Sequence, residues 1–137
     1  MKKAFFLIMV LLTGAVFTAC NVTTANLSDI KMCEQLDGKL CAADQIVFTT
    51  NAAELYLSCK LNNAPAETKV KFSWFFLGEE KVFIDEVALT TDGSQTQYEL
   101  HSSLSKPNNG WPAGNYEVII TIDANEASSI TKLFSIQ

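Results

Sequence analysis

From residue 44 onward the chain consists of short runs in which apolar and polar residues alternate. One run places Leu55, Leu57, Cys59 and Leu61 on one side and polar residues on the other. Residues two apart share one face of a β-strand, so this spacing predicts strands and not helices. Turn-forming residues separate the runs, and no long helical pattern occurs. The expected strands are 45–50, 54–61, 69–77, 81–90, 95–103, 115–123 and 129–136.

Seven short strands at this spacing indicate an antiparallel sandwich or a small closed barrel. Clean alternation leaves each sheet one solvated face, which excludes a doubly wound parallel sheet. The run 81–90 departs from this pattern because both of its faces are partly apolar.

Three spacings favour one kind of sandwich. Cys59 lies on the second expected strand, and Trp74 follows 15 residues later on the third, both on apolar faces. The segment from Ala113 to Val118 resembles the tyrosine corner of immunoglobulin-like domains, with Tyr116 two residues before the second disulfide cysteine. Val118 occupies that cysteine position here, so no disulfide between the sheets is expected.

Residues 44–137 therefore resemble the single Ig-like (or fibronectin III-like) domains of bacterial exported lipoproteins. The resemblance implies an all-β, antiparallel Ig-like sandwich of about seven strands. It makes Trp74 and Val118 core residues and directs the Tyr116 hydroxyl to backbone upstream. The apolar position of Cys59 predicts a buried free thiol that behaves as a small hydrophobe.

The first 19 residues have the layout of a secretory signal peptide. Lys2 and Lys3 precede a nine-residue apolar run, Ala4–Leu12, and small residues follow. That run is too short to span a bilayer core of about 30 Å as a stable helix.

The residues that follow the apolar run resemble the bacterial lipobox. Phe17–Cys20 ends in a small residue and a cysteine, although Phe17 stands where leucine is usual. The resemblance implies that Cys20 carries a lipid and anchors the chain in the cell envelope. Because Asn21 is not aspartate, an outer-membrane destination is favoured in a Gram-negative host. Plain cleavage after Ala15, which would give a secreted protein, is the alternative.

Residues 20–32, polar at their start, are expected to contain the lipidated cysteine and a flexible tether. The next segment, 33–43, is expected to be a turn closed by a Cys33–Cys41 disulfide. Either a short helix from Ser28 to Asp37 or a three-residue hairpin loop, Leu36–Gly38, with Gly38 in the left-handed conformation would bring the two sulfurs together.

Charge and composition narrow the classes of function. Beyond the leader, 8 lysines face 15 acidic residues, a formal charge of −7, and the chain has no arginine. Such a domain is a poor candidate for binding nucleic acid, which requires neutralisation of phosphates. The size and composition also disfavour a multidomain enzyme.

No arrangement of residues in the sequence predicts catalysis. His101, the one histidine, falls on a polar face beside Glu99, which indicates a solvated side chain. No serine or cysteine nucleophile accompanies it in a known motif, and no glycine-rich phosphate loop occurs. We therefore expect no enzyme activity, no cofactor and no metal site.

One loop suggests a surface role. In Ser105–Pro112, two prolines and the amides of Asn108 and Asn109 surround Trp111. Trp111 either plugs the end of the sandwich, the favoured interpretation, or stands exposed as an anchor for a partner.

Two functions follow from these features. The first is a non-catalytic, membrane-tethered envelope protein whose Ig-like domain acts as a structural module or binds another envelope or extracellular protein. The second is a secreted or anchored inhibitor of a hydrolase that acts through the Trp111 loop. Many unrelated roles use this fold, so the fold alone does not identify the partner.

Overall fold

The computed structural model of the chain describes residues 24–125 and 128–137. The predicted signal peptide (1–19) and the lipidation residue Cys20 lie outside the described residues. Within them the chain forms eight β-strands and no α-helix, so no helix there could cross a membrane. The strands are β1 (Asn26–Cys33), β2 (Val47–Phe48), β3 (Glu54–Asn62), β4 (Lys69–Leu77), β5 (Lys81–Thr90), β6 (Gln97–Ser105), β7 (Gly114–Ile122) and β8 (Ile130–Ile136).

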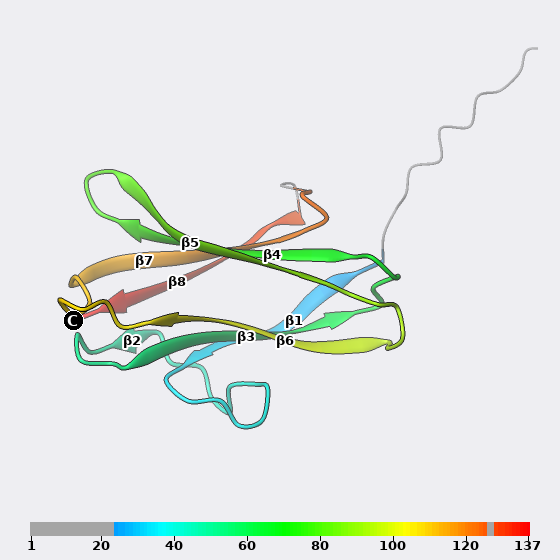
Figure 1. Cartoon of the computed structure of the whole chain (residues 1–137), viewed down its shortest axis with the longest axis horizontal. Helices are drawn as coiled ribbons and strands as arrows, with labels where there is room; N and C mark the ends of the chain where they lie inside the picture. The colour runs from blue at the N-terminus through cyan, green and yellow to red at the C-terminus, as the bar shows by residue number, and fades with distance from the viewer. Residues whose placement is uncertain (1–23, 126–127) are drawn as a thin grey trace, which may run out of the picture.

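The strands form two sheets that pack face to face (Figure 1). The smaller sheet has the order β1-β3-β6 and the larger one the order β2-β8-β7-β4-β5. Every pair is antiparallel except the two-residue pair of β2 with β8. The predicted all-β Ig-like sandwich is confirmed, with β2 much shorter than the expected strand 45–50.

The core lies between the two sheets and is rich in aromatic residues. Trp74 on β4 donates a hydrogen bond from Nε1 to Ser102 Oγ on β6, 2.9 Å away, and so joins the two sheets. The Phe134 ring stacks on Tyr116 at 5.1 Å and meets the edge of Trp74 at 6.0 Å. Alternation along each strand buries these residues because inward positions recur every second residue.

The segment 26–32 corrects the sequence prediction, because it is strand β1 and not part of a flexible tether. It pairs with β3 from Asn26↔Asn62 to Cys33↔Tyr56. The register shifts between Ser28 and Lys31, where Asp29 has a positive φ of 53°. This bulge interrupts the alternation of the strand and conceals it in the sequence.

The helical alternative for the segment after β1 is wrong. The chain turns back in a hairpin with Gly38 left-handed, as the second alternative expected, but the loop is shifted from the expected Leu36–Gly38. Asp37 and Leu40 form an isolated antiparallel bridge, in which Asp37 N–H donates to Leu40 O at 2.8 Å. Gly38 has a φ of 68°, the left-handed conformation that glycine adopts at little cost. The chain thus reverses over Gly38 and Lys39.

The two ends of the sandwich differ in what they carry (Figure 1). At the end that we call proximal, β1 begins, and Asn62 lies between Asn26 and Gln97. The opposite, distal end carries the β4–β5 hairpin, the loop 106–113 and the C-terminal residue Gln137. Any attachment through residue 20 would therefore leave the proximal end nearer to the point of attachment.

Candidate interaction surface

The Trp111 loop closes the distal end of the sandwich. Trp111 is only 5% exposed, and its Nε1 donates a hydrogen bond to Ala52 O at 2.6 Å. The favoured plug interpretation is therefore correct, and the alternative of an exposed tryptophan anchor is wrong. Asn108 and Asn109 are exposed beside it. Without an exposed indole the inhibitor alternative loses the feature on which it rested, and it stays an untested prediction.

The four predicted core residues lie where the resemblance placed them. Trp74 and Val118 are opposite each other on β4 and β7, and each is at most 1% exposed. The Tyr116 hydroxyl donates to Pro112 O, four residues upstream, at 2.5 Å, which forms the expected tyrosine corner. Cys59 is a buried free thiol, and burial raises its pKa to about 12. A thiol of this kind is chemically inert at neutral pH.

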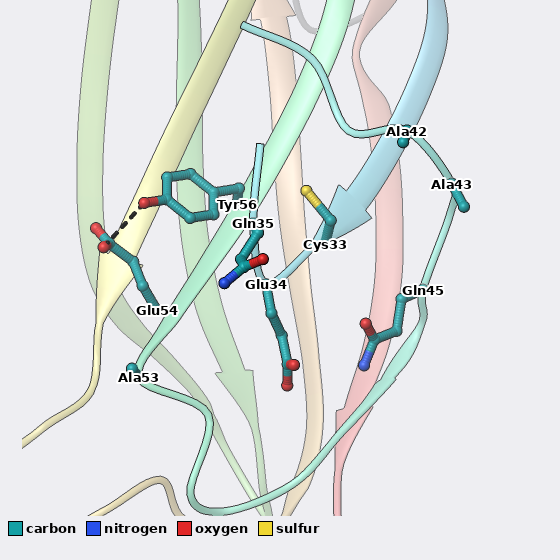
Figure 2. A pocket seen from close by; sticks show the side chains of 9 residues that line it. All are labelled: Cys33, Glu34, Gln35, Ala42, Ala43, Gln45, Ala53, Glu54 and Tyr56. Carbon is teal, nitrogen blue, oxygen red and sulfur yellow. Dashed lines mark hydrogen bonds between the residues drawn. The ribbon is translucent and has the colours of Figure 1, made fainter. Parts of the chain in front are cut away.

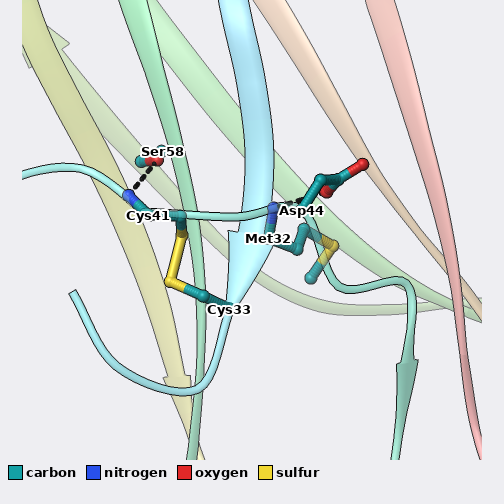
Figure 3. Close-up of a disulfide and its surroundings, with 5 residues drawn as sticks. All are labelled: Met32, Cys33, Cys41, Asp44 and Ser58. Atoms are coloured by element: carbon teal, nitrogen blue, oxygen red, sulfur yellow. Dashed lines mark hydrogen bonds between the residues drawn. A yellow bond between two sulfur atoms is a disulfide. The ribbon is translucent and has the colours of Figure 1, made fainter. Parts of the chain in front are cut away.

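The predicted Cys33–Cys41 disulfide is present, with the two Cα atoms 5.7 Å apart (Figure 3). It joins the end of β1 to the segment that returns toward β2. The Cys41 N–H donates to Ser58 Oγ on β3 at 2.8 Å, so the returning chain is held on the smaller sheet.

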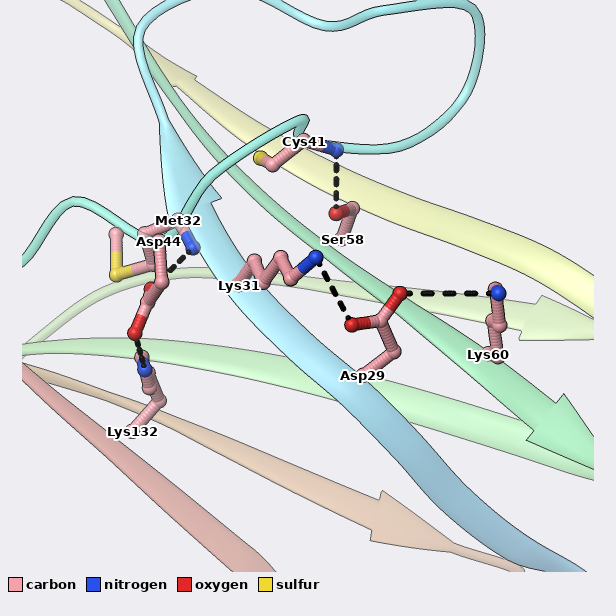
Figure 4. Close-up of polar contacts among 8 residues, drawn as sticks. All are labelled: Asp29, Lys31, Met32, Cys41, Asp44, Ser58, Lys60 and Lys132. Carbon is pink, nitrogen blue, oxygen red and sulfur yellow. Dashed lines mark hydrogen bonds and ion pairs between the residues drawn. The ribbon is translucent and has the colours of Figure 1, made fainter.

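Asp44 links the same returning segment to both sheets (Figure 4). Its Oδ1 accepts the Met32 N–H of β1 at 2.9 Å, and its Oδ2 accepts Lys132 Nζ of β8 at 2.6 Å. Partial burial acts to raise the pKa of Asp44, but these two hydrogen bonds outweigh it and lower the pKa below the ordinary value. We call this arrangement the Asp44 clamp.

A hollow of about 620 Å³ opens beside the disulfide (Figure 2). Its polar lining includes Glu34, Gln35, Glu54 and Tyr56. The Tyr56 hydroxyl donates to Glu54 Oε2 at 3.0 Å, a bond that raises the pKa of Tyr56. Within residues 24–125 and 128–137 no group of three or more His, Cys, Asp or Glu side chains is placed to hold a metal ion.

The exposed apolar residues gather on the larger sheet, a feature that the sequence did not localise. Among the described residues, the large hydrophobic side chains that are more than a third exposed lie on this sheet or directly before it: Ile46, Val47, Val82, Phe83, Ile84, Val87 and Leu133. Four of them belong to β5, and Phe83 is 56% exposed. Apolar patches concentrated in this way mark interaction sites more often than scattered exposed residues do.

The position of β5 explains its exposure. β5 is the last strand of the five-stranded sheet and pairs only with β4, while the facing sheet has three strands. Nine of its ten residues are exposed, including Asp85 and Val87, which lie opposite core residues of β4; Leu89 is the exception. Its outer edge therefore presents backbone groups that no other strand pairs, together with apolar side chains on both faces. The Glu86 N–H of this strand donates to Asp85 Oδ1 at 2.8 Å. We call Val82, Phe83, Ile84 and Val87, with this backbone, the β5 edge.

One ion pair interrupts the outer face of the larger sheet. Lys81, the first residue of β5, pairs with Glu117 of β7, whose side chain is only 11% exposed. The ammonium also lies 4.3 Å from the centre of the Phe75 ring, which in turn meets Phe83 edge-on at 5.8 Å. Burial of the Glu117 carboxylate is tolerated because its counter-charge sits beside it.

An apolar hollow of about 420 Å³ lies farther along the same face, lined by Ile46, Val47, Leu77 and Leu133 among others. The outer face thus carries this hollow and, on β5, the Phe83 ring. Val82 and Val87 of the β5 edge point to the opposite, inner side of the sheet, because they pair with the inward residues Phe76 and Phe72 of β4.

Comparisons with known proteins support the fold and give no family. No protein-family model matches the sequence, and no curated protein matches it. Among solved structures, a β-glucosidase from Erythrobacter marinus superposes with a TM-score of 0.52 at 8% identity; the match covers 84% of this chain. It covers 16% of that enzyme, so this chain spans a small part of its length. The CARDB domain of the PF1109 protein from Pyrococcus furiosus gives a TM-score of 0.47 at 15% identity, over 82% of this chain and 89% of that one. The order and pairing of its own strands make this chain a small all-β domain with an Ig-like sandwich fold.

Proposed function

We propose that this protein is a non-catalytic, exported lipoprotein, tethered through Cys20, whose Ig-like domain binds an envelope or extracellular protein through the β5 edge. The observation that carries the proposal is the exposure of β5. An extended segment of a partner can add to such an edge as a further strand, with backbone hydrogen bonds supplying affinity. The side chains of Val82 and Phe83 would then select an apolar partner segment.

The arrangement of the sandwich supports this role. Val82, Phe83 and Ile84 lie in the half of β5 next to the hairpin, at the distal end (Figure 1). A chain anchored near its N-terminus would present this end away from the membrane. The Asp44 clamp and the disulfide stabilise the opposite, β1–β8 side of the sandwich, which leaves the β5 side open for binding.

Lipid attachment is tested by the mass of the protein and by replacing the cysteine. We expect the mature membrane-extracted chain to begin at Cys20 and to carry a diacyl or triacyl addition. A Cys20→Ser variant lacks the lipid anchor, so we expect it to be released from the membrane without detergent. A mature chain without acyl groups that begins after Ala15 would show that the protein is secreted.

Partner binding is tested by placing a photo-crosslinking amino acid at Phe83, with Glu99 of β6 as the matched exposed control. We expect position 83, and not position 99, to yield a crosslinked envelope protein. With that protein purified, Phe83→Ser should weaken binding at least tenfold, since aromatic residues dominate interface energies. Glu99→Ser should leave the affinity unchanged. Equal labelling from both positions, or an affinity insensitive to Phe83→Ser, would contradict the proposal.

A further inference from the structure

We infer that the partner of the β5 edge is β5 of a second copy of this chain, paired antiparallel. The inference rests on the proposed function, because it names the occupant of the same edge. It follows from the bulge in β5, from the placement of its charges and from the position of its apolar residues.

The bulge places Lys81 and Glu86 on the same face of the sheet. Lys81 lies opposite Leu77 of β4 and Glu86 lies opposite Ser73, and these two β4 residues are four apart. The register shift between Trp74 and Phe75 inserts one extra residue into β5. In a regular strand, residues five apart would point to opposite faces.

Few registers of the two β5 strands place Lys81 of one copy opposite Glu86 of the other without bringing like charges together. If Lys81 lies opposite Glu86 of the second copy, the two-fold axis repeats the pair, and Val82 lies opposite Asp85. Lys81 and Glu86 then share one face, and Val82 and Asp85 share the other, as antiparallel pairing requires. A register with Lys81 opposite Thr90 would instead place Asp85 opposite Glu86, and like charges directly opposite are destabilising.

The Lys81 ammonium can serve both carboxylates. It has three N–H donors, of which one meets Glu117 of its own chain. Its side chain is 45% exposed, which leaves room for Glu86 of the second copy. The pair is therefore compatible with the fold of each protomer.

Apolar contacts form at the centre of the same pairing. Phe83 lies opposite Ile84 of the second copy, next to the axis. These side chains are 56% and 38% exposed in the single chain. Six paired residues on each side make a small interface, so we expect a weak dimer that depends on concentration.

The pairing also fixes where the two points of attachment lie. The axis passes near residues 83 and 84, toward the distal end, and it reverses the strand direction. The proximal ends of the two sandwiches therefore point away from each other. For chains anchored through Cys20, this geometry joins copies on two facing membranes.

Site-directed crosslinking of the exported chain tests the register. We expect a mixture of the Val82→Cys and Asp85→Cys variants to form a disulfide-linked dimer under mild oxidation. The matched mixture of Val82→Cys with Val87→Cys should remain largely monomeric, although Val87 is as exposed as Ile84. Crosslinking that is equal in both mixtures, or absent from both, would overturn the register.

Sedimentation of the intact, disulfide-oxidised protein tests the charges. Glu86→Lys sets two lysines opposite each other, and we expect it to raise the dissociation constant of the dimer at least tenfold, with circular dichroism unchanged. Glu99→Lys, the same charge change on β6, should leave the dimer intact. A wild-type chain that stays monomeric at millimolar concentration refutes self-pairing. If position 83 then still crosslinks to another envelope protein, the proposed function stands; if it crosslinks to nothing, both fall.

Discussion

Replacing Trp111 with alanine is expected to lower the free energy of unfolding by about 3–5 kcal/mol, the usual cost of truncating a buried tryptophan. The indole fills the distal end of the core and is 5% exposed. Its removal also leaves Ala52 O without the hydrogen bond from Nε1. Since the free energy of unfolding of a domain of this size is about 5–15 kcal/mol, this one change would remove a large part of its stability.

Urea denaturation measures the loss, and two further variants identify its cause. Trp111→Phe keeps most of the apolar volume but removes the N–H group, so its cost should be smaller, about 1–3 kcal/mol for an unsatisfied buried carbonyl. Asn109→Ala, in the same loop but exposed, should change stability by less than about 0.5 kcal/mol. A Trp111→Ala protein as stable as the Asn109→Ala protein would mean that the loop does not close the core.

The period-two pattern predicted most of the fold because it reflects which residues face the core. β3 and β4 bury alternate residues, and their expected ranges differ from the observed ones by at most one residue. Tyr116 was predicted correctly because a tyrosine corner is local, with donor and acceptor only four residues apart. Local features of this kind can be recognised in a sequence without knowledge of the rest of the fold.

Features that depend on distant parts of the chain could not be predicted in the same way. The bulge at Asp29 makes β1 hard to recognise in the sequence. The alternation of inward and outward residues shifts at the bulge, so the two halves of the strand do not share one continuous pattern. The sequence favoured a buried Trp111, but its hydrogen-bond partner Ala52 lies 59 residues away, and no local pattern reveals that contact.

The exposure of β5 depends on the number of strands in the opposite sheet. One sign of this exposure is visible in the sequence, since apolar residues occupy both faces of 81–90. A strand that is apolar on both faces can be fully buried or can bind a partner on each side, and only the sheet order separates these cases. The three-stranded sheet leaves β5 uncovered, which makes the second explanation the better one.

Removing the disulfide with the double change Cys33→Ser and Cys41→Ser is expected to cost about 2–3 kcal/mol. The bond closes a loop with a sequence separation of 8, and the chain-entropy model gives this range for so short a loop. Reduction of the wild-type protein should produce the same loss in a denaturation experiment. The double variant should be insensitive to the reductant, because Cys59, the one cysteine that then remains among the described residues, is a buried free thiol.

Without the disulfide, the returning segment depends more on the Asp44 clamp, so the loss should be greater in acid, where the clamp weakens. The pKa of Asp44 is lowered in the folded state, so the clamp contributes fully above the unfolded value of 3.8 and weakens as the pH falls below it. An Asp44→Asn change in the double variant should remove this added acid sensitivity. If the double variant and the wild type lose stability in parallel between pH 5 and about pH 2, the clamp and the disulfide do not support the same segment.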